Sequence, residues 1–249
     1  MLKLILGNAF NVKFGILSDA HGNALGFNAC LKRLIAMQMD EILFLGDVVG
    51  YMPDFSDVIS QIRKNDVRCL LGNHDAMLIG AVPLEEKKDL VYKIGDAAER
   101  MSDSDRTFFS TLKPWYEVDV NGRKLLFVHG SPRNPLNEYI YPDTDIEWFD
   151  AFKYDAFFMG HTHRPFVRRT LSNKLIANVG SCGLPRDQGN LFSFAVYDSS
   201  NHTCDIYRIE FEVERLVRQY SKSVHNVVNK CFKRQDSNIF GIMIHERSS

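Results

Sequence analysis

Two histidines stand two residues apart in the stretch FFMGHTHRP, where His161 and His163 follow an apolar run. Residues at i and i+2 share one face of a strand, whereas a helix would turn them well apart. The neighbouring Gly160 and Pro165 disfavour the continuation of either element. The pair is therefore predicted to lie in a tight turn, which can present two imidazoles to two adjacent metal ions, one to each.

Further candidate metal ligands also follow apolar stretches and stand near glycines: Asp19 and His21 in SDAHGN, Asp47 in LGDVVG, Asn73 in GNHD and His129 in FVHGSP. With the two histidines of the turn they form a set of oxygen and nitrogen donors without a thiolate, which suits Mn²⁺ or Fe and tolerates Zn²⁺. Seven donors are too many for one ion. They fit two ions about 3.5–4 Å apart that share one carboxylate, as in two-metal hydrolysis. Any one of these residues alone is more often a core or surface residue, so the prediction depends on the whole set.

The first half of the chain alternates short apolar strands with helices. Strands are predicted at 12–17, 41–45 and 68–71, and helices at 24–39 and around 55–62. This alternation indicates a buried, largely parallel sheet. Because the polar residues follow the strands, we expect the site at the carboxyl edge of that sheet.

The middle of the chain is predicted to be helical and the second half to be a mixed or antiparallel sheet. One helix is expected over 84–101, and a second after Ser102, a suitable N-cap. Asn121-Gly122 lies between two apolar segments and predicts a hairpin. The strands expected from there on are 116–120, 124–128, 156–159, 166–171, 174–179, 191–197 and 203–209.

From Val213 onward, apolar residues recur at three-to-four spacing as far as Cys231 and predict an amphipathic helix. Its other face carries Arg215, Arg218, Lys222 and Lys230. The interpretation we favour is a solvated cationic face on a helix packed against the domain. A membrane-surface or partner-binding helix is the alternative. The last dozen residues are expected to form a partly ordered tail.

The composition is that of an ordinary globular protein, with 249 residues, 45% of them hydrophobic, 24% charged and a formal charge of -1. The charge gives no general reason to expect a nucleic-acid or membrane partner. No apolar stretch approaches the roughly 18 residues of a membrane span, and the opening MLKLILGNAFNVKF does not read as a secretory signal. The cysteines are scattered without CxxC spacing, which favours reduced thiols and predicts a cytoplasmic location. They are Cys30, Cys69, Cys182, Cys204 and Cys231.

The ordered series D-x-H-G-N, G-D-x-x-G, G-N-H-D, H-G and G-H-T-H resembles the calcineurin-like metallophosphoesterase superfamily over roughly Lys13 to Glu210. The stretches GDVVGYMPD, HGSPRNPLNEY and NVGSCGLPRD further resemble a bacterial and archaeal branch of small, phosphodiesterase-like members. The resemblance implies an α/β (α+β) fold, with two mixed β-sheets packed as a sandwich and flanked by helices. The domains expected from it are a short extension at 1–12, a catalytic domain at 13–210, and a C-terminal amphipathic helix and tail at 211–249 packed on the same domain.

The resemblance also implies how the metals are bound. The first ion would take Asp19, His21, Asp47 and His163, and the second Asp47, Asn73, His129 and His161, so that Asp47 bridges. Two divalent ions per chain are expected, with manganese favoured and Fe, Zn, Ni or Co as alternatives. A hydroxide between the ions would attack phosphorus in line with the leaving oxygen.

Four residues near the predicted ligands have implied or open roles. His74 would hydrogen-bond a phosphoryl oxygen or protonate the leaving group, or else support the ligands from outside. Asp75 would orient His74 or cap the following helix. Arg164 and Arg186 would each clamp a phosphate or form a surface ion pair. Cys182 is interpreted as a small loop filler.

One departure from the superfamily bears on the substrate. In the protein phosphatase branch an aspartate and an arginine follow the G-D motif, where this chain has Gly50 and Tyr51. The chain therefore lacks an anchor for a phosphomonoester dianion at this place, which favours phosphodiesters. The alternatives are a phosphomonoesterase acting on a nucleotide or small phosphorylated metabolite, a 2′,3′-cyclic nucleotide hydrolase, and a non-catalytic binding module. The expected partner is a small phosphoester, and a homo-oligomer is compatible with the sequence.

Overall fold

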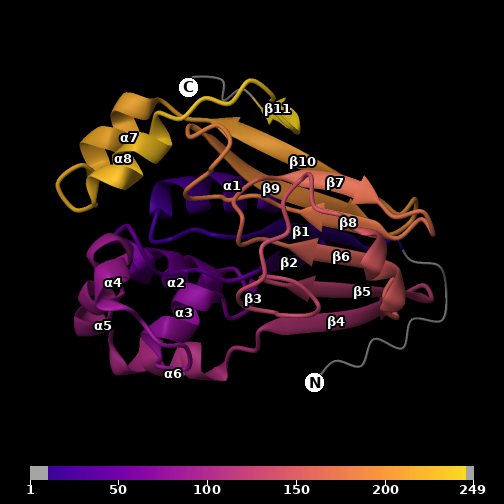
Figure 1. Ribbon diagram of the computed structural model, residues 1–249, viewed down its shortest axis with the longest axis horizontal. Helices are drawn as coiled ribbons and strands as arrows, with labels where there is room; N and C mark the ends of the chain where they lie inside the picture. Colours follow the sequence, from indigo (N-terminus) through magenta and orange to yellow (C-terminus); the bar gives the residue numbers. More distant parts are fainter. Residues whose placement is uncertain (1–10, 245–249) are drawn as a thin grey trace.

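Two β-sheets face each other in the computed structural model, which describes residues 11–244 (Figure 1). Within this part of the chain the first sheet has the order β11-β10-β9-β1-β2-β3 and the second the order β4-β5-β6-β8-β7. Strands β1, β2 and β3 are mutually parallel, whereas β9 runs antiparallel to β1, so both parallel and antiparallel pairs occur. The two mixed sheets with flanking helices confirm the predicted fold class.

The strands of the first sheet are β1 (Lys13–Leu17), β2 (Glu41–Phe44), β3 (Arg68–Cys69), β9 (Leu191–Asp198), β10 (Thr203–Glu210) and β11 (Ile242–Ile244). Those of the second are β4 (Trp115–Val120), β5 (Arg123–Val128), β6 (Ala156–Met159), β7 (Phe166–Arg169) and β8 (Leu175–Asn178). The predicted hairpin at Asn121-Gly122 joins β4 to β5.

Strand alternation places one apolar face of each sheet in a shared core. Phe14 and Ile16 of β1 pack in this core with Phe127 and Phe158 of the second sheet, and the rings of Phe14 and Phe127 are 5.5 Å apart. The other face of β1 packs on α1 (Ala24–Ala36). A Cβ at Gly15 would lie 2.8 Å from a methyl carbon of Leu34, so the missing side chain lets this helix pack closely.

Helices α2 to α6 gather beside the first sheet, to the left of the strands in Figure 1. Their bounds are α2 (Phe55–Lys64), α3 (Asn73–Leu78), α4 (Glu86–Tyr92), α5 (Ile94–Arg100) and α6 (Asp103–Thr111). As predicted, Ser102 caps α6, because its hydroxyl accepts from the N–H of Asp105 at 3.1 Å. The outer face of the second sheet packs on a short 3₁₀ helix, η1 (Glu147–Ala151).

The single helix predicted over 84–101 is wrong, because the chain forms α4 and α5 instead. Lys93 between them has a left-handed backbone with φ of 60°. The carboxylate of Asp89 accepts from the N–H groups of Ile94 at 2.7 Å and Gly95 at 3.1 Å. This side chain satisfies the first donors of α5, so a new helix starts where the periodic pattern predicted continuation.

The predicted C-terminal helix is also divided, into α7 (Val213–Tyr220) and α8 (Asn226–Phe232). The Nδ1 atom of His225 accepts from the N–H of Val227 at 3.3 Å and caps α8. The apolar side is buried against the domain through Leu216, Tyr220, Val228 and Phe232, and the predicted cationic side chains are exposed.

Within the expected partly ordered tail, residues 242–244 form β11 beside β10, a strand that the sequence did not predict. Residues 245–249, and all but the last two residues of the expected extension at 1–12, lie outside the described residues.

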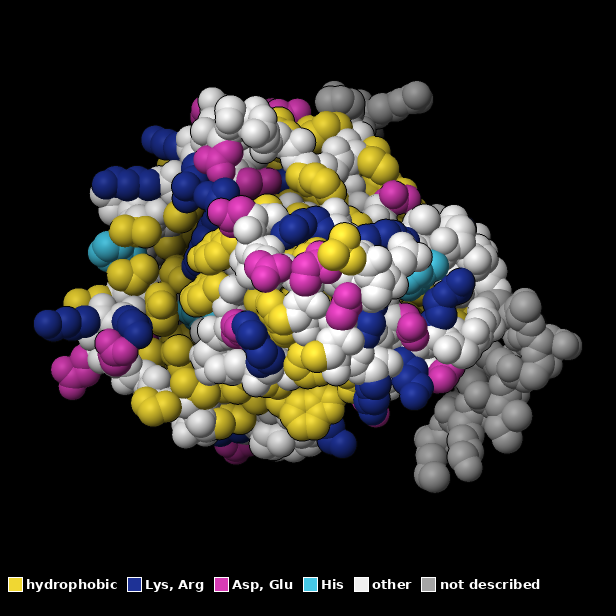
Figure 2. Space-filling model, turned by 45° about the vertical axis from the view of Figure 1, so that its right-hand side comes forward, with side chains coloured by type: hydrophobic (Ala, Val, Ile, Leu, Met, Phe, Trp, Pro, Cys, Tyr) yellow, Lys and Arg dark blue, Asp and Glu magenta, His cyan; other side chains and the backbone are white. Residues whose placement is uncertain are grey.

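No helix of residues 11–244 is long and apolar enough to cross a membrane. On the face shown in Figure 2, basic and acidic side chains are interspersed.

Candidate metal centre

The predicted ligands meet at the carboxyl ends of β1, β2, β3, β5 and β6, where the loops are tied together by backbone hydrogen bonds. The N–H of Asp19 donates to the carbonyl of Gly46 at 3.0 Å, and the N–H of Gly160 donates to the carbonyl of His129 at 3.0 Å. The structure brings the whole predicted set together and buries it: Asp19, His21, Asp47, Asn73, His129, His161 and His163.

Direct contacts connect these side chains into one cluster. The Nε2 atom of His163 lies 3.0 Å from Nε2 of His21 and 3.2 Å from Oδ1 of Asp19. The Oδ2 atom of Asp47 lies 3.5 Å from Nε2 of His21 and 3.4 Å from Nε2 of His129. Asp47 is therefore placed between the two sides of the cluster, as the bridging role requires.

Three of the imidazoles are fixed by backbone carbonyl groups. Nδ1 of His21 lies 3.1 Å from the oxygen of Val49, Nδ1 of His129 lies 3.0 Å from that of Leu45, and Nδ1 of His163 lies 2.5 Å from that of Leu184. Because a carbonyl oxygen only accepts, each Nδ1 carries a proton. The Nε2 atoms of His21 and His163 therefore present lone pairs to the cluster, whereas Nε2 of His129 donates to the amide oxygen of Asn73 at 3.0 Å. Metal-binding histidines are oriented in this way by a partner on the other ring nitrogen.

The donor set fits divalent metal ions. The facing lone pairs of His21 and His163 repel each other unless a cation lies between them. Within residues 11–244, Oδ1 of Asp19 and Nε2 of His161 are buried without a hydrogen-bond partner. Buried polar atoms are rarely left unsatisfied. One bound cation would satisfy Asp19, His21 and His163, and a second would satisfy His161.

The donors fall into three groups whose ligand atoms lie within 4.8 Å of one another. Asp19, His21 and His163 make one group, and Asp47, His129 and His161 make another, in agreement with the two halves of the expected scheme. The amide oxygen of Asn73 lies 3.0 Å from Nε2 of His129 and so belongs to the second half. The third group joins His74 to His21 and Asp47.

The ligand loops have an unusual backbone. Five of the seven predicted ligands have positive φ angles between 50° and 66°: Asp19, His21, Asp47, His161 and His163. Such left-handed conformations are uncommon for residues other than glycine and often occur at functional sites. A Cβ at Gly72 would lie 2.1 Å from Oδ1 of Asp47, so only glycine allows this close approach.

Burial and charge keep most of the imidazoles neutral. Burial lowers the pKa values of His21 and His163, and it lowers that of His161 to about 3. Burial also opposes the charging of His129, but the carboxylates of Asp47 and Asp19 outweigh it and raise the pKa of His129 to about 9. Despite burial, His129 and the other imidazoles hold the pKa of Asp47 well below its usual value. The carboxylate is thus ionised, as a ligand must be.

His74 lies beside the predicted ligands, and within residues 11–244 one nitrogen of its ring has no hydrogen-bond partner. Its backbone N–H donates to Oδ1 of Asp47 at 2.8 Å. Its ring is 4.7 Å from that of His21 and 4.4 Å from that of Tyr92. Its Nδ1 is buried without a hydrogen-bond partner among the described residues. Burial lowers the pKa of His74 to about 4, so this imidazole is neutral at pH 7.

Asp75 performs the second of its two expected roles, that of a cap. Its carboxylate accepts from the N–H groups of Asp47 at 2.8 Å, Val48 at 2.9 Å, Val49 at 3.2 Å and Gly72 at 3.1 Å. No hydrogen bond links it to the His74 ring among the described residues. Burial and the nearby Asp47 raise the pKa of Asp75 to about 7. Asp75 therefore fixes the loop that carries Asp47.

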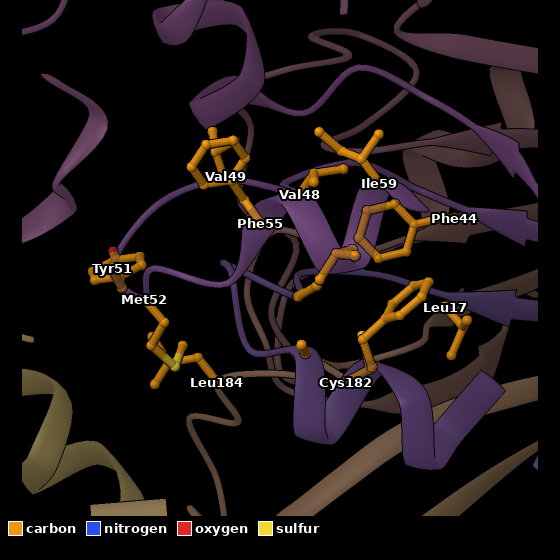
Figure 3. Close-up of a cluster of buried hydrophobic side chains, with 14 of the residues drawn as sticks. Leu17, Phe44, Val48, Val49, Tyr51, Met52, Phe55, Ile59, Cys182 and Leu184 are labelled. Carbon is orange, nitrogen blue, oxygen red and sulfur yellow. The ribbon is translucent and has the colours of Figure 1, made fainter. Parts of the chain in front are cut away.

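Apolar side chains also fix the loop that follows Asp47. Figure 3 shows Val48 and Val49 within a buried cluster that also contains Cys182 and Leu184, while Tyr51 lies at its edge. Cys182 is buried, and burial raises the pKa of its thiol well above the ordinary value, which suits the expected role of loop filler.

The two arginines expected near the site differ in their contacts. Arg164 forms an ion pair with Asp236, with Nη1 and Oδ2 2.9 Å apart, which matches the surface alternative. Arg186 instead donates from Nη2 to the hydroxyl of Tyr51 at 3.1 Å. Its backbone N–H donates to the carbonyl of His163 at 3.2 Å, so this arginine lies next to the predicted metal ligands.

Sequence reasoning assigned no contact with the histidines to three tyrosines that surround the site. The ring of Tyr139 stacks on that of His161 at 3.9 Å, and the rings of Tyr51 and Tyr92 lie 5.2 Å and 4.4 Å from that of His74. Tyr51 and Tyr139 stand in the stretches GDVVGYMPD and HGSPRNPLNEY and were detectable as residues close to ligands. Tyr92 comes from α4, and no sequence signal connects it with the site.

Comparisons with known proteins agree with this geometry. A family model for the calcineurin-like phosphoesterase superfamily domain matches residues 12–202. An uncharacterised protein of Methanocaldococcus jannaschii is 31% identical over 232 residues, which cover 85% of this chain and 91% of that protein. The fold is similar to that of a metallophosphoesterase from Sphaerobacter thermophilus, with a TM-score of 0.76, 24% identity and coverage of 90% of this chain and 99% of that one. It is also similar to that of a hypothetical protein from Pyrococcus horikoshii, with a TM-score of 0.74, 18% identity and coverage of 89% and 97%.

Proposed function

Because this chain belongs to the calcineurin-like phosphoesterase superfamily, we propose that it is a phosphoester hydrolase that uses two divalent metal ions and acts on phosphodiesters. The observation that carries the proposal is the pair of imidazole Nε2 atoms, from His21 and His163, that face each other at 3.0 Å with both protons on the opposite nitrogens. This arrangement is unfavourable in an empty site and favourable around a cation.

The proposed ligands are those of the predicted set, with Asp47 shared. Asp19, His21, Asp47 and His163 would hold one ion, and Asp47, Asn73, His129 and His161 the other. When bound, divalent ions would neutralise charge on the phosphoryl oxygens and acidify water. A mixed oxygen and imidazole set without thiolate favours manganese, with Fe, Zn, Ni and Co as alternatives.

The chain's own residues would orient the reacting groups and donate a hydrogen bond to the leaving oxygen. Hydrolysis forms a bond from phosphorus to a water oxygen and breaks the bond to the leaving alcohol, which takes up a proton. His74 is neutral at pH 7 and lies beside His21 and Asp47, so its ring would donate a hydrogen bond to the leaving oxygen. Asp75 keeps Asp47 and His74 in place through the loop contacts described above.

The preference for diesters is supported by the residues that follow Asp47. A Cβ at Gly50 would lie 2.4 Å from Nδ1 of His74, so no side chain fits between this loop and the imidazole. The next position carries a neutral tyrosine instead of a cation. A diester has a single negative charge and needs less positive charge around it than a monoester dianion.

The test is turnover of bis-p-nitrophenyl phosphate by purified protein that has been stripped of metal and reloaded with Mn²⁺. We expect nitrophenol release from the reloaded protein and little from the stripped one. A matched control is Asp205→Asn, which changes an exposed carboxylate on β10 and should retain full activity. Absence of turnover on this diester and on p-nitrophenyl phosphate, with each of the candidate metals, would contradict the proposal.

A further inference from the structure

Arg186 brings a positive charge to the candidate site from a loop far away in the sequence. Its guanidinium donates to the hydroxyl of Tyr51, a residue 135 positions earlier in the chain. Among residues 11–244, Arg186 forms no ion pair with a carboxylate, unlike Arg164, which is paired with Asp236. The sequence left Arg186 between a phosphate clamp and a surface ion pair, and its contact with Tyr51 favours the clamp.

The position of Arg186 is fixed by its neighbours in the loop. The next residue, Asp187, forms a buried bidentate pair with Arg208 of β10, with contacts of 2.5 Å and 3.0 Å. Arg208 is fully buried and also donates to the carbonyls of Leu191 at 2.7 Å and Phe240 at 3.1 Å. The ion pair with Arg208 fixes Asp187, and the backbone N–H of Arg186 donates to the carbonyl of His163. The backbone of Arg186 is therefore fixed next to the predicted metal ligands.

The positive charge of Arg186 lowers the pKa values of two histidines in the candidate site. After burial, it is the largest contribution that lowers the pKa of His163, and it also contributes to the lowered pKa of His74. Despite burial, Tyr51, Tyr139, Asp19 and Cys231 together raise the pKa of Arg186, so its guanidinium is charged. Its partner Tyr51 has its ring 4.8 Å from that of His21 and 5.2 Å from that of His74, so the guanidinium lies beside the predicted metal centre.

We propose that Arg186, held by Tyr51, binds an anionic oxygen of a phosphomonoester dianion, so that the site hydrolyses monoesters as well as diesters. A guanidinium can donate two parallel hydrogen bonds to a phosphoryl group, and such charge-assisted bonds are strong. The inference rests on the proposed function and extends its substrate class to phosphomonoesters, including the monoester left when a diester loses its first alcohol.

The two reactions balance without a further reactant. In the first, water adds to the diester, one phosphorus–oxygen bond to an alcohol breaks, and the products are that alcohol and a monoester. In the second, water adds to the monoester, the remaining bond to an alcohol breaks, and the products are the second alcohol and inorganic phosphate. In each step the leaving alcohol keeps the proton.

The first test is the end point of bis-p-nitrophenyl phosphate hydrolysis with the manganese-loaded full chain. Wild type is expected to release two nitrophenols per substrate and to leave inorganic phosphate. Arg186→Gln should stop after one, leaving p-nitrophenyl phosphate, and Arg186→Lys should be intermediate. Arg218→Gln, an exposed arginine on α7, is the matched control and should behave like wild type.

The second test measures binding by calorimetry, with inorganic phosphate as the dianion probe and dimethyl phosphate as the monoanion probe. Loss of a charged hydrogen-bond partner predicts phosphate binding weaker by about tenfold to a hundredfold in Arg186→Gln, with a much smaller change for dimethyl phosphate. Tyr51→Phe, which removes only the hydroxyl that holds the guanidinium, should show a smaller change in the same direction.

The outcomes separate the two proposals. If wild type hydrolyses neither chromogen, the proposed function fails, while the binding data still decide the role of Arg186. If wild type stops after one nitrophenol, or if Arg186→Gln slows both steps and weakens both probes equally, the assignment of Arg186 to the dianion is overturned.

Discussion

His21 and His163 direct their Nε2 atoms at each other across 3.0 Å, while backbone carbonyls of Val49 and Leu184 hold both Nδ1 atoms. The contact joins loops that are 142 residues apart in the chain. Two lone pairs held this close repel each other, so the folded arrangement is predicted to depend on a bound cation.

Removal of metal ions should therefore lower the thermal stability of the protein. A ligand that binds only the folded state stabilises it by about 2.7 kcal/mol at a free concentration of 100 times its Kd. We expect a Tm several degrees lower after treatment with a chelator, and recovery with Mn²⁺. Scanning calorimetry measures this, and Ca²⁺ serves as the control because it prefers oxygen ligands to imidazole. Equal Tm values with and without Mn²⁺ would count against the metal centre.

Asp47→Asn should reduce the metal content of both halves of the centre. Oδ2 of Asp47 lies within 3.5 Å of an imidazole on each side, so loss of its negative charge weakens both groups of donors. Elemental analysis of purified protein is expected to show far less bound manganese than in wild type. Asp205→Asn, at an exposed carboxylate, should keep the wild-type content. Full occupancy in Asp47→Asn would refute the shared role of this residue.

His74→Ala should leave the metal content unchanged and reduce kcat by about 10²–10³-fold, the usual cost of removing one hydrogen-bond donor from the developing charge. The reason is that both ions retain their proposed ligands, whereas the leaving oxygen loses its donor. Since His74 lies in a donor group with His21 and Asp47, metal analysis must accompany the kinetics. A parallel loss of manganese and activity would instead make His74 a metal ligand.

Removal of one partner from the buried ion pair of Arg208 and Asp187 should destabilise the folded protein. Arg208→Met leaves Asp187 buried without its partner and is expected to lower the free energy of unfolding by about 3–5 kcal/mol. Removal of both charges in Asp187→Leu/Arg208→Met should recover much of this loss. Urea unfolding of the two single variants and the double variant measures it, and additive effects would show that the two side chains do not depend on each other.

The sequence predicted which residues gather at the candidate site because each of them comes shortly after an apolar strand and stands near a glycine, and parallel strands bring their carboxyl ends together. Asp19, Asp47 and His129 are examples of this local rule. The fold class followed from the same alternation of strands and helices, together with the ordered motifs.

What the sequence did not reveal depends on contacts between distant segments or on single side chains. The break at Lys93 is created by the Asp89 carboxylate, which a periodic pattern does not register. The sequence could not show that Arg164 contacts Asp236 and Arg186 contacts Tyr51, because these partners are 72 and 135 residues away. Likewise, the approach of Tyr92 to His74 depends on how α4 packs over the site.

The most direct test of the central claim is anomalous X-ray scattering from crystals of the protein grown with Mn²⁺. The account predicts two manganese peaks, one among Asp19, His21 and His163 and the other among Asn73, His129 and His161, with Asp47 in contact with both. A map without a manganese peak among these side chains, at a Mn²⁺ concentration that supports turnover, would contradict it.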